Sequence, residues 1–156
     1  MQRDPQGDWY QTPLYYDIIF DQDTAEEVDF VEAVARRFGY RRRKRLRVLE
    51  PACGSGRLMV ELARRGHQVS GFDLEPAMVS YTESRLADAG LGGAVAAGRM
   101  ERFSLGGGVF DLAHCFVSTF KYILTERGAR SHLRHVAKSL KPGGLYLLGF
   151  HLSDYG

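Results

Sequence analysis

A chain of 156 residues with a formal net charge of +2 is long enough to bury the core of one domain. Its composition is that of a globular protein, and no apolar run approaches the roughly 20 residues of a membrane-spanning helix. The N-terminus lacks the basic start and apolar core of a signal peptide. The two cysteines, Cys53 and Cys115, are too few for a disulfide framework or a zinc site, so we expect a cytoplasmic protein without a metal.

Residues 1–45 predict a helical cap segment in front of the main domain. Leu14 to Phe20 fit a short helix, and a longer helix with apolar residues at helical spacing follows. Thr24 with Glu27 three residues later predicts a capping box at the start of that helix, and Gly39 suits its end. The aromatic residues of this segment, Trp9, Tyr10, Tyr15 and Tyr16, either form a lid over a site or pack in the core.

Charge is distributed unevenly along this first part of the chain. Residues 17–32 are acidic and residues 36–47 are basic, with an unbroken basic run at 41–45. We interpret the basic run at 41–47 as a solvated loop that pairs with the acidic helix. A nucleic-acid surface is the disfavoured alternative, because no aromatic residues or second basic stripe extend the run.

From residue 46 onward, predicted strands and helices alternate. The strands cover 46–50, 68–73, 94–97, 110–117 and 145–150; the helices cover 57–65, 75–89 and 126–140; a turn covers 141–144. This alternation predicts an α/β fold with a doubly wound, mainly parallel sheet of about five strands and helices on both faces. We expect 46–156 to form a cofactor-binding domain and the whole chain to be one compact unit.

The most informative segment runs from Val48 to Arg57. A buried strand ends on the acid Glu50, a loop of small residues follows, and a helix begins. Gly54 and Gly56 let a ligand approach the backbone closely, and the start of the helix directs free N–H groups at that ligand. The segment therefore predicts a nucleotide-type cofactor site.

Dinucleotide-binding domains use a similar loop, but with three glycines. The position for the third glycine holds Met59 here. In addition, the carboxylate of Glu50 would repel a pyrophosphate but would suit a cationic ligand. A nicotinamide-dependent oxidoreductase is therefore a less favoured interpretation.

A second acid, Asp73, ends the strand at 68–73. In a doubly wound sheet this strand lies beside the first, and a carboxylate at its end can accept hydrogen bonds from both ribose hydroxyls. The alternative is that Asp73 only caps the following helix. The glycine loop on the neighbouring strand favours ribose binding.

Two segments, EPACGSGR at 50–57 and GFDLEPAM at 71–78, resemble the class I S-adenosylmethionine-dependent methyltransferases. Three later segments, at 97–100, 110–116 and 140–145, agree with that family in order and spacing. The resemblance covers about 46–150 and implies a Rossmann-like fold with S-adenosyl-L-methionine as cofactor. It also implies that the fourth strand lies beside the first, which would bring Cys53 and Cys115 near one another as packing residues.

The resemblance implies a role for each part of the site. The loop at 52–56 would lie under the methionine portion of the cofactor with help from Glu50, and Asp73 would hold the ribose. Three apolar side chains would sandwich the adenine, and Phe116 would face the sulfonium and the methyl acceptor. The implied cofactor-binding residues are Glu50, Ala52, Cys53, Gly54, Gly56, Asp73, Leu74, Met78, Arg99, Met100 and Phe116.

This sequence departs from the family's pattern at two positions. Ala52 stands at the first glycine of the loop, which is a mild change. Arg99 stands where the family usually has an acid, so a side-chain acceptor for the adenine amino group is missing. We expect backbone groups near Met100 to bind the ring instead.

Methyl transfer from a sulfonium needs positioning and the removal of water more than chemical help. A general base is needed only if the acceptor arrives protonated. His114, His151 and Tyr16 are candidate bases by location, and each has a purely structural alternative, so no catalytic residue is assigned. We expect a small-molecule acceptor, with a nucleic-acid acceptor as the less favoured alternative through the basic run. Val117–Phe120 stands where amino-group nucleic-acid methyltransferases carry an Asn/Asp-Pro-Pro-aromatic motif.

The family normally adds an antiparallel pair of strands after the fifth strand, and this sequence ends at Gly156. The apolar strand at 145–150 would then form an exposed sheet edge, which favours pairing with another chain. We therefore also expect either a truncated cofactor-binding domain without activity of its own, or one completed by a partner or a second copy through 145–150.

Overall fold

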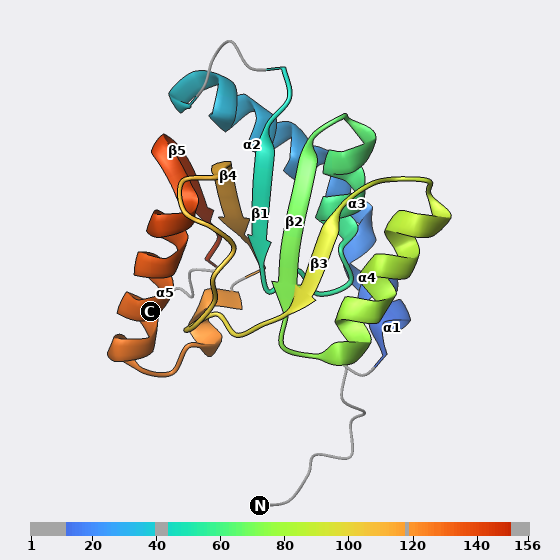
Figure 1. Ribbon diagram of the computed structural model, residues 1–156. Helices are drawn as coiled ribbons and strands as arrows, with labels where there is room; N and C mark the ends of the chain where they lie inside the picture. The colour runs from blue at the N-terminus through green and yellow to red at the C-terminus, as the bar shows by residue number, and fades with distance from the viewer. Residues whose placement is uncertain (1–11, 40–43, 118, 151–156) are drawn as a thin grey trace, which may run out of the picture.

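A parallel sheet with the strand order β3-β2-β1-β4-β5 forms the centre of the fold (Figure 1). The computed structural model describes residues 12–39, 44–117 and 119–150. The strands are β1 (Arg47–Pro51), β2 (Gln68–Asp73), β3 (Ala94–Ala97), β4 (Phe110–Cys115) and β5 (Leu140–Leu148). The helices are α1 (Pro13–Phe20), α2 (Thr24–Phe38), α3 (Arg57–Arg64), α4 (Pro76–Asp88) and α5 (Glu126–Ser139), with short 3₁₀ turns η2 (Asp21–Asp23) and η3 (Thr119–Tyr122). Within the described ranges, no helix has both the length and the apolar character needed to cross a bilayer.

The strand order confirms the predicted doubly wound parallel sheet. The chain passes from β1 outward through β2 to β3, and then returns to β4 on the other side of β1. The carboxyl ends of β1 and β4 therefore diverge into helices on opposite faces, which is where ligands bind in open α/β sheets. The register pairs Glu50 with Gly71 of β2, and Leu49 with Ala113 of β4.

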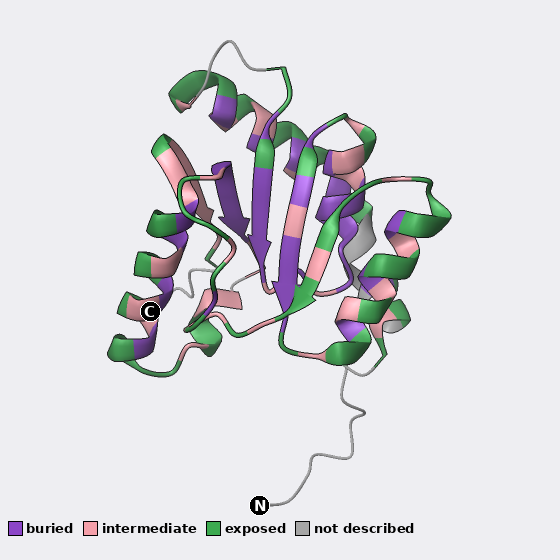
Figure 2. Cartoon of the chain, in the orientation of Figure 1, coloured by how far each residue is buried: buried purple, intermediate pink, exposed green. Residues whose placement is uncertain are grey.

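Two apolar clusters cover the two faces of the sheet. On one face, residues of α2, α3 and α4 pack against alternate strand positions such as Val48, Val69 and Leu112. On the other face, Val136 of α5 and the chain before β4 pack against Leu49. β1 and β4 are mostly buried, whereas the edge strand β3 is largely exposed (Figure 2).

The start of α2 differs from the prediction. Asp23 is the N-cap residue and makes no side-chain capping hydrogen bond, so the expected capping box of Thr24 and Glu27 is wrong. Both side chains instead contact Arg57 of α3. A buried guanidinium offers these oxygens a stronger partner than a neutral backbone N–H does.

The end of the sheet also differs from the prediction. The segment 141–144, expected as a turn, belongs to β5, which begins at Leu140. A register shift opposite Phe110 and Leu112 of β4 accommodates the extra residues, so the glycines mark a bulge rather than a turn. β4 ends at Cys115, two residues earlier than predicted.

The close packing of α3 on β2 predicts a measurable cost for one added methyl group. A Cβ on Gly71 would lie 2.6 Å from the Met59 sulfur and 3.0 Å from the Cys53 Cβ. We expect Gly71→Ala to lower the free energy of unfolding by about 1–3 kcal/mol in urea denaturation, since overpacking strains a filled core.

Gly92→Ala is the matched control for this prediction. Gly92 is exposed, and a Cβ there would meet nothing within 4 Å. We expect its unfolding free energy to stay within about 0.5 kcal/mol of the unsubstituted protein. Equal losses for the two variants would contradict the packing described here.

Candidate cofactor site at the carboxyl end of the sheet

The loop between β1 and α3 has a backbone that few sequences tolerate. Ala52, Gly54 and Gly56 all have positive φ, at 53°, 56° and 71°. A Cβ on Gly54 would meet nothing within 4 Å, so its backbone faces open space that a ligand can reach. A Cβ on Gly56 would lie 2.3 Å from the side chain of Thr82, so that glycine is required for packing against α4.

Asp73 and Thr82 hold this loop from the neighbouring elements. One carboxylate oxygen of Asp73 accepts a hydrogen bond from the Gly54 N–H at 2.8 Å, and the other accepts one from the Glu75 N–H at 3.0 Å. The Thr82 hydroxyl donates to the Gly54 carbonyl at 2.8 Å. The two ends of β1 and β2 are thus joined through Gly54, which lies at the centre of the predicted site.

The structure bears on the alternative interpretation of Asp73 as a helix cap. The N-cap of α4 is Glu75, and its side chain makes no capping bond, so Asp73 is not the helix cap. A carboxylate has about four lone-pair sites, and two of them are used by backbone N–H groups here. Two sites remain for hydroxyl donors, which is what a ribose with two adjacent hydroxyls presents.

Glu50 is a buried acid with an unused oxygen. It is 9% exposed, and its Oε2 atom has no hydrogen-bond partner among the described residues. Burial raises the pKa of this carboxyl well above its usual range, and the nearby Arg57 charge opposes that rise. A buried acid that lacks a partner suits an incoming cation, whose charge would restore the ionised form.

His114 lies directly beside Glu50. Its ring is fully buried, its Nε2 atom lies 3.9 Å from Glu50 Oε2, and neither ring nitrogen has a hydrogen-bond partner within the described chain. Burial, and then the charge of Arg57, lower the pKa of His114 to about 3. The imidazole is therefore neutral, and it has no surface through which an acceptor could reach it.

Arg57 supplies the positive charge that both groups feel. It is 5% exposed at the first position of α3. Its guanidinium donates to both carboxylate oxygens of Glu27 at 2.8 and 3.0 Å, and to the Thr24 hydroxyl at 3.1 Å. One guanidinium nitrogen thus contacts both oxygens of Glu27, and this charged pair attaches α2 to the start of α3. Acidic residues of α2 therefore pair with α3. The expected pairing of the basic run with the acidic helix stays a prediction, because residues 41–43 lie outside the described part of the chain.

The residues predicted to sandwich an adenine differ in exposure. Leu74 is 54% exposed beside Asp73, whereas Met78 is fully buried in α4. Met100 is half-buried. Arg99 is exposed, and its backbone forms an isolated antiparallel β-bridge with that of Arg102. The Gly98 N–H donates to the Asp73 carbonyl at 2.9 Å, so the chain after β3 begins beside the ribose position.

The chain after β4 turns sharply at the acceptor side of the predicted site. Phe116 is half-buried, with its ring centroid 5.2 Å from that of His114 and 6.5 Å from that of Phe30 in α2. Val117 has a φ of 55°, which is rare for a β-branched residue. Strained backbone of this kind clusters at functional sites. The side chain of Tyr16 and all of His151 lie outside the described part of the chain.

Sequence reasoning missed the groups that hold the site together. Thr82 and His132 carry no motif that distinguishes them from ordinary helix residues, and Arg57 ends the motif at 50–57 but was given no role. The contacts of these three residues cross 28 to 33 positions of sequence. Gly56 was the one available signal, because a glycine in this loop can indicate that another element, here α4 with Thr82, packs closely against it. A groove of about 730 Å³ against β1, β2 and β3 lies elsewhere, and none of the implied cofactor residues lines it.

Comparisons with known proteins agree with this geometry. Residues 48–144 match a family model described as a methyltransferase domain. Magnesium-protoporphyrin O-methyltransferase of Rhodobacter capsulatus is 33% identical over 113 residues, covering 67% of this chain and 49% of that protein. The curated relatives are matched over 43% to 49% of their length, so the chain spans about half of each.

Solved structures show the same fold. The sugar N-methyltransferase KedS8 of Streptoalloteichus is 26% identical, with a TM-score of 0.76 over 99% of this chain and 58% of that chain. A S-adenosylmethionine-dependent methyltransferase of Clostridium acetobutylicum is 24% identical, with a TM-score of 0.75 over 90% of this chain and 56% of that chain. The second likeness concerns the fold alone.

The burial of His114 predicts the pH dependence of stability. Its pKa is about 3 in the fold against a usual 6.5, so the unfolded chain binds more protons between these values. Stability from this group therefore rises with pH from about 3 to 6.5 and is constant above. We expect the difference in unfolding free energy between the unsubstituted protein and His114→Gln to rise over the same pH range. The slope of that difference with pH should correspond to at most one proton.

Glu50→Gln provides the opposite control. The raised pKa of Glu50 means that the fold binds the extra proton, so its contribution to stability is lost as pH rises above 4.5. The difference between the unsubstituted protein and this variant should fall with pH in urea unfolding series. If the His114 difference stayed flat from pH 3 to 6.5, the neutral buried imidazole would be contradicted.

Proposed function

Because the chain belongs to the methyltransferase-domain family, we propose that it provides the S-adenosyl-L-methionine site of an enzyme that methylates a small molecule. The observation that carries the proposal is that the buried acid Glu50 lies at the end of the strand that leads into the open loop around Gly54. A buried, unpartnered acid lies below a loop whose backbone is open to a ligand. A pyrophosphate would be repelled there, whereas the ammonium and sulfonium of this cofactor would be attracted.

The described residues fit the other parts of the cofactor. Asp73 has two lone-pair sites left for the ribose hydroxyls. Leu74 offers an exposed apolar surface for the adenine, and Met100 offers part of one. Met78 has no exposed surface, so we assign it to the core beneath the site and not to contact with the adenine.

When bound, the cofactor supplies an activated methyl group on a sulfonium. The chain's residues orient the two reactants and keep water away. Phe116, seated on the buried His114 ring, and the strained turn at Val117 form the side where the acceptor would approach. His114 is too deeply buried to take a proton from an acceptor, so we assign no general base.

The proposal of a small-molecule acceptor rests on the names of similar proteins. One relative is named for magnesium-protoporphyrin and one structural neighbour for a sugar. Both acceptors are small molecules, and they differ from each other in chemistry. We propose only that class for this chain. A cytoplasmic location, where Cys53 and Cys115 stay reduced, is part of the same proposal.

A second candidate is a cofactor-binding domain that is inactive alone and is completed by a partner or a second copy. Two observations support it: the chain spans about half of its curated relatives, and within the described residues β5 pairs only with β4. A nicotinamide-dependent enzyme is disfavoured, because Met59 fills the space against Gly71 where dinucleotide folds need close packing around a third glycine.

Ligand binding to a Glu50 variant tests the cofactor assignment. We expect Glu50→Gln to weaken S-adenosylmethionine by about tenfold in calorimetry, because the charged pair with the ammonium is lost. The control ligand is 5′-methylthioadenosine, which has no amino-acid tail, and its affinity should be unchanged. Equal weakening of both ligands would show that Glu50 does not hold the tail, and binding of NADH in their place would overturn the cofactor.

Turnover separates the two candidates. The active enzyme should convert S-adenosylmethionine to S-adenosylhomocysteine when a panel of porphyrin, sugar-amine and phenolic acceptors is supplied. Binding without turnover on any acceptor, with turnover restored by adding the remaining part of a relative, would favour the incomplete domain.

A further inference from the structure

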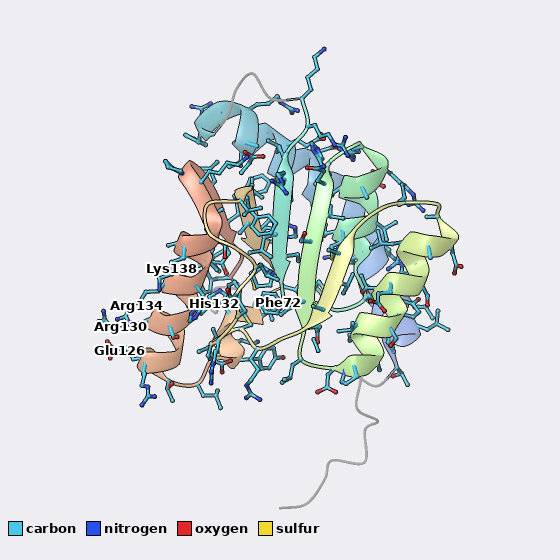
Figure 3. The ribbon with its side chains drawn as sticks, in the orientation of Figure 1. Phe72, Glu126, Arg130, His132, Arg134 and Lys138 are labelled. Carbon is cyan, nitrogen blue, oxygen red and sulfur yellow. The ribbon has the colours of Figure 1, made fainter. Side chains whose placement is uncertain are left out.

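His132 of α5 connects two parts of the molecule that lie far apart in sequence. Its ring is fully buried, with Nδ1 at 2.9 Å from the Met100 carbonyl and Nε2 at 2.5 Å from the Tyr146 hydroxyl. In Figure 3 His132 lies on the side of α5 that faces Phe72 and the sheet, whereas Glu126, Arg130, Arg134 and Lys138 lie on its outer side.

The two partners fix the tautomer of His132. A carbonyl oxygen can only accept, so Nδ1 carries the proton and donates it to Met100. Nε2 is then an acceptor, and the Tyr146 hydroxyl donates to it. Burial lowers the pKa of His132 and raises that of Tyr146, which keeps both groups neutral and this direction of bonding intact.

Ser131, the residue before His132, contacts Glu101, the residue after Met100 in the loop that follows β3. The Ser131 hydroxyl donates to the Glu101 carbonyl at 2.7 Å. Two consecutive residues of α5 therefore bind two consecutive carbonyls of the loop after β3. The ring of Phe103 closes the other side, with its centroid 4.6 Å from that of Phe72 and 6.1 Å from that of His132.

This support matters because the loop lacks the acidic side chain that would accept a hydrogen bond from the adenine amino group. Arg99 stands where similar proteins carry an acid, so adenine recognition falls to the backbone around Met100. Adenine presents a donor and an acceptor on that edge, and hypoxanthine presents the reverse. A backbone carbonyl and N–H can tell these bases apart only if they are held in place, because a mobile loop would adapt to either.

We propose that Ser131 and His132 are positioning residues that make the backbone of residues 99–101 selective for adenine, in place of the missing acid. The proposal rests on the assignment of S-adenosylmethionine as cofactor. It extends that assignment to two residues of α5 that need not touch the cofactor. Their effect passes through the Met100 and Glu101 carbonyls.

The test is the ratio of two affinities, measured by calorimetry with S-adenosyl-L-homocysteine and S-inosyl-L-homocysteine. The unsubstituted protein should prefer the adenine compound. In His132→Phe this preference should fall by about tenfold, and in Ser131→Ala by about threefold, because one held carbonyl is released in each. Ser131 is only half-buried, so Ser131→Ala decides the question if His132→Phe does not fold.

His135→Phe is the matched control. His135 lies one turn along α5 and its ring also packs near Phe103, at 5.4 Å, but its hydrogen bonds go to Ser131 within the same helix. It should keep the preference within about twofold, even if its stability falls as much as that of the other variants. If the role of His132 were purely structural, His132→Phe would lower the stability of the protein without changing the ratio of the two affinities.

The outcomes separate this inference from the proposed function. Protein that binds neither compound would overturn the cofactor and this inference together. Protein that binds both equally well, or that keeps its preference in His132→Phe and Ser131→Ala, would overturn this inference and leave the cofactor in place. Nitrogen NMR of His132 adds an independent check, since a proton on Nε2 in place of Nδ1 would contradict the bonding pattern.

Discussion

The carboxylate of Asp73 accepts one hydrogen bond from the loop after β1 and another from the turn before α4, and the candidate site depends on this double contact. This contact holds Gly54 with its backbone facing open space, while the Thr82 hydroxyl donates a hydrogen bond to the carbonyl of the same residue. The arrangement is possible because β1 and β2 are parallel neighbours whose carboxyl ends meet. The side chain that organises the loop keeps two lone-pair sites, and we propose that these bind the ribose of the cofactor.

Near this loop, ionisable side chains are buried, which reduces the stability of the fold, and some of their polar atoms have no hydrogen-bond partner. Arg57 is paired with α2, whereas Oε2 of Glu50 and both ring nitrogens of the adjacent His114 are buried without a hydrogen-bond partner among the described residues. Buried polar groups without partners reduce stability, and proteins retain them mainly at sites of function. We propose that a cationic ligand offsets this cost by contacting the unused oxygen of Glu50. The neutral His114 beside it then serves as a polar but uncharged wall and as the surface on which Phe116 rests.

The local periodicity of the sequence predicted much of the fold. The bounds of β2 and β3 agree with prediction, because short strands between clear helix and turn signals leave little choice. The capping box at Thr24 failed because Arg57, 33 residues away, competes for the same oxygens. The turn at 141–144 failed because pairing with β4 extends the strand through a bulge. Asp73 and the glycine loop were found because they carry local motifs. His132 was not, since its partners, the Met100 carbonyl and the Tyr146 hydroxyl, lie 32 and 14 positions away and form no local motif.

A structure of the protein with S-adenosyl-L-homocysteine bound would test the central claim most directly. We predict that the amino-acid tail lies over Gly54 with its ammonium toward Glu50, that both ribose hydroxyls lie within hydrogen-bonding distance of Asp73, and that the adenine rests on Leu74. Asp73 should keep its bond to the Gly54 N–H in the complex. A ligand bound elsewhere, or an Asp73 side chain that turns away from the loop and makes no contact with the ribose, would contradict the account.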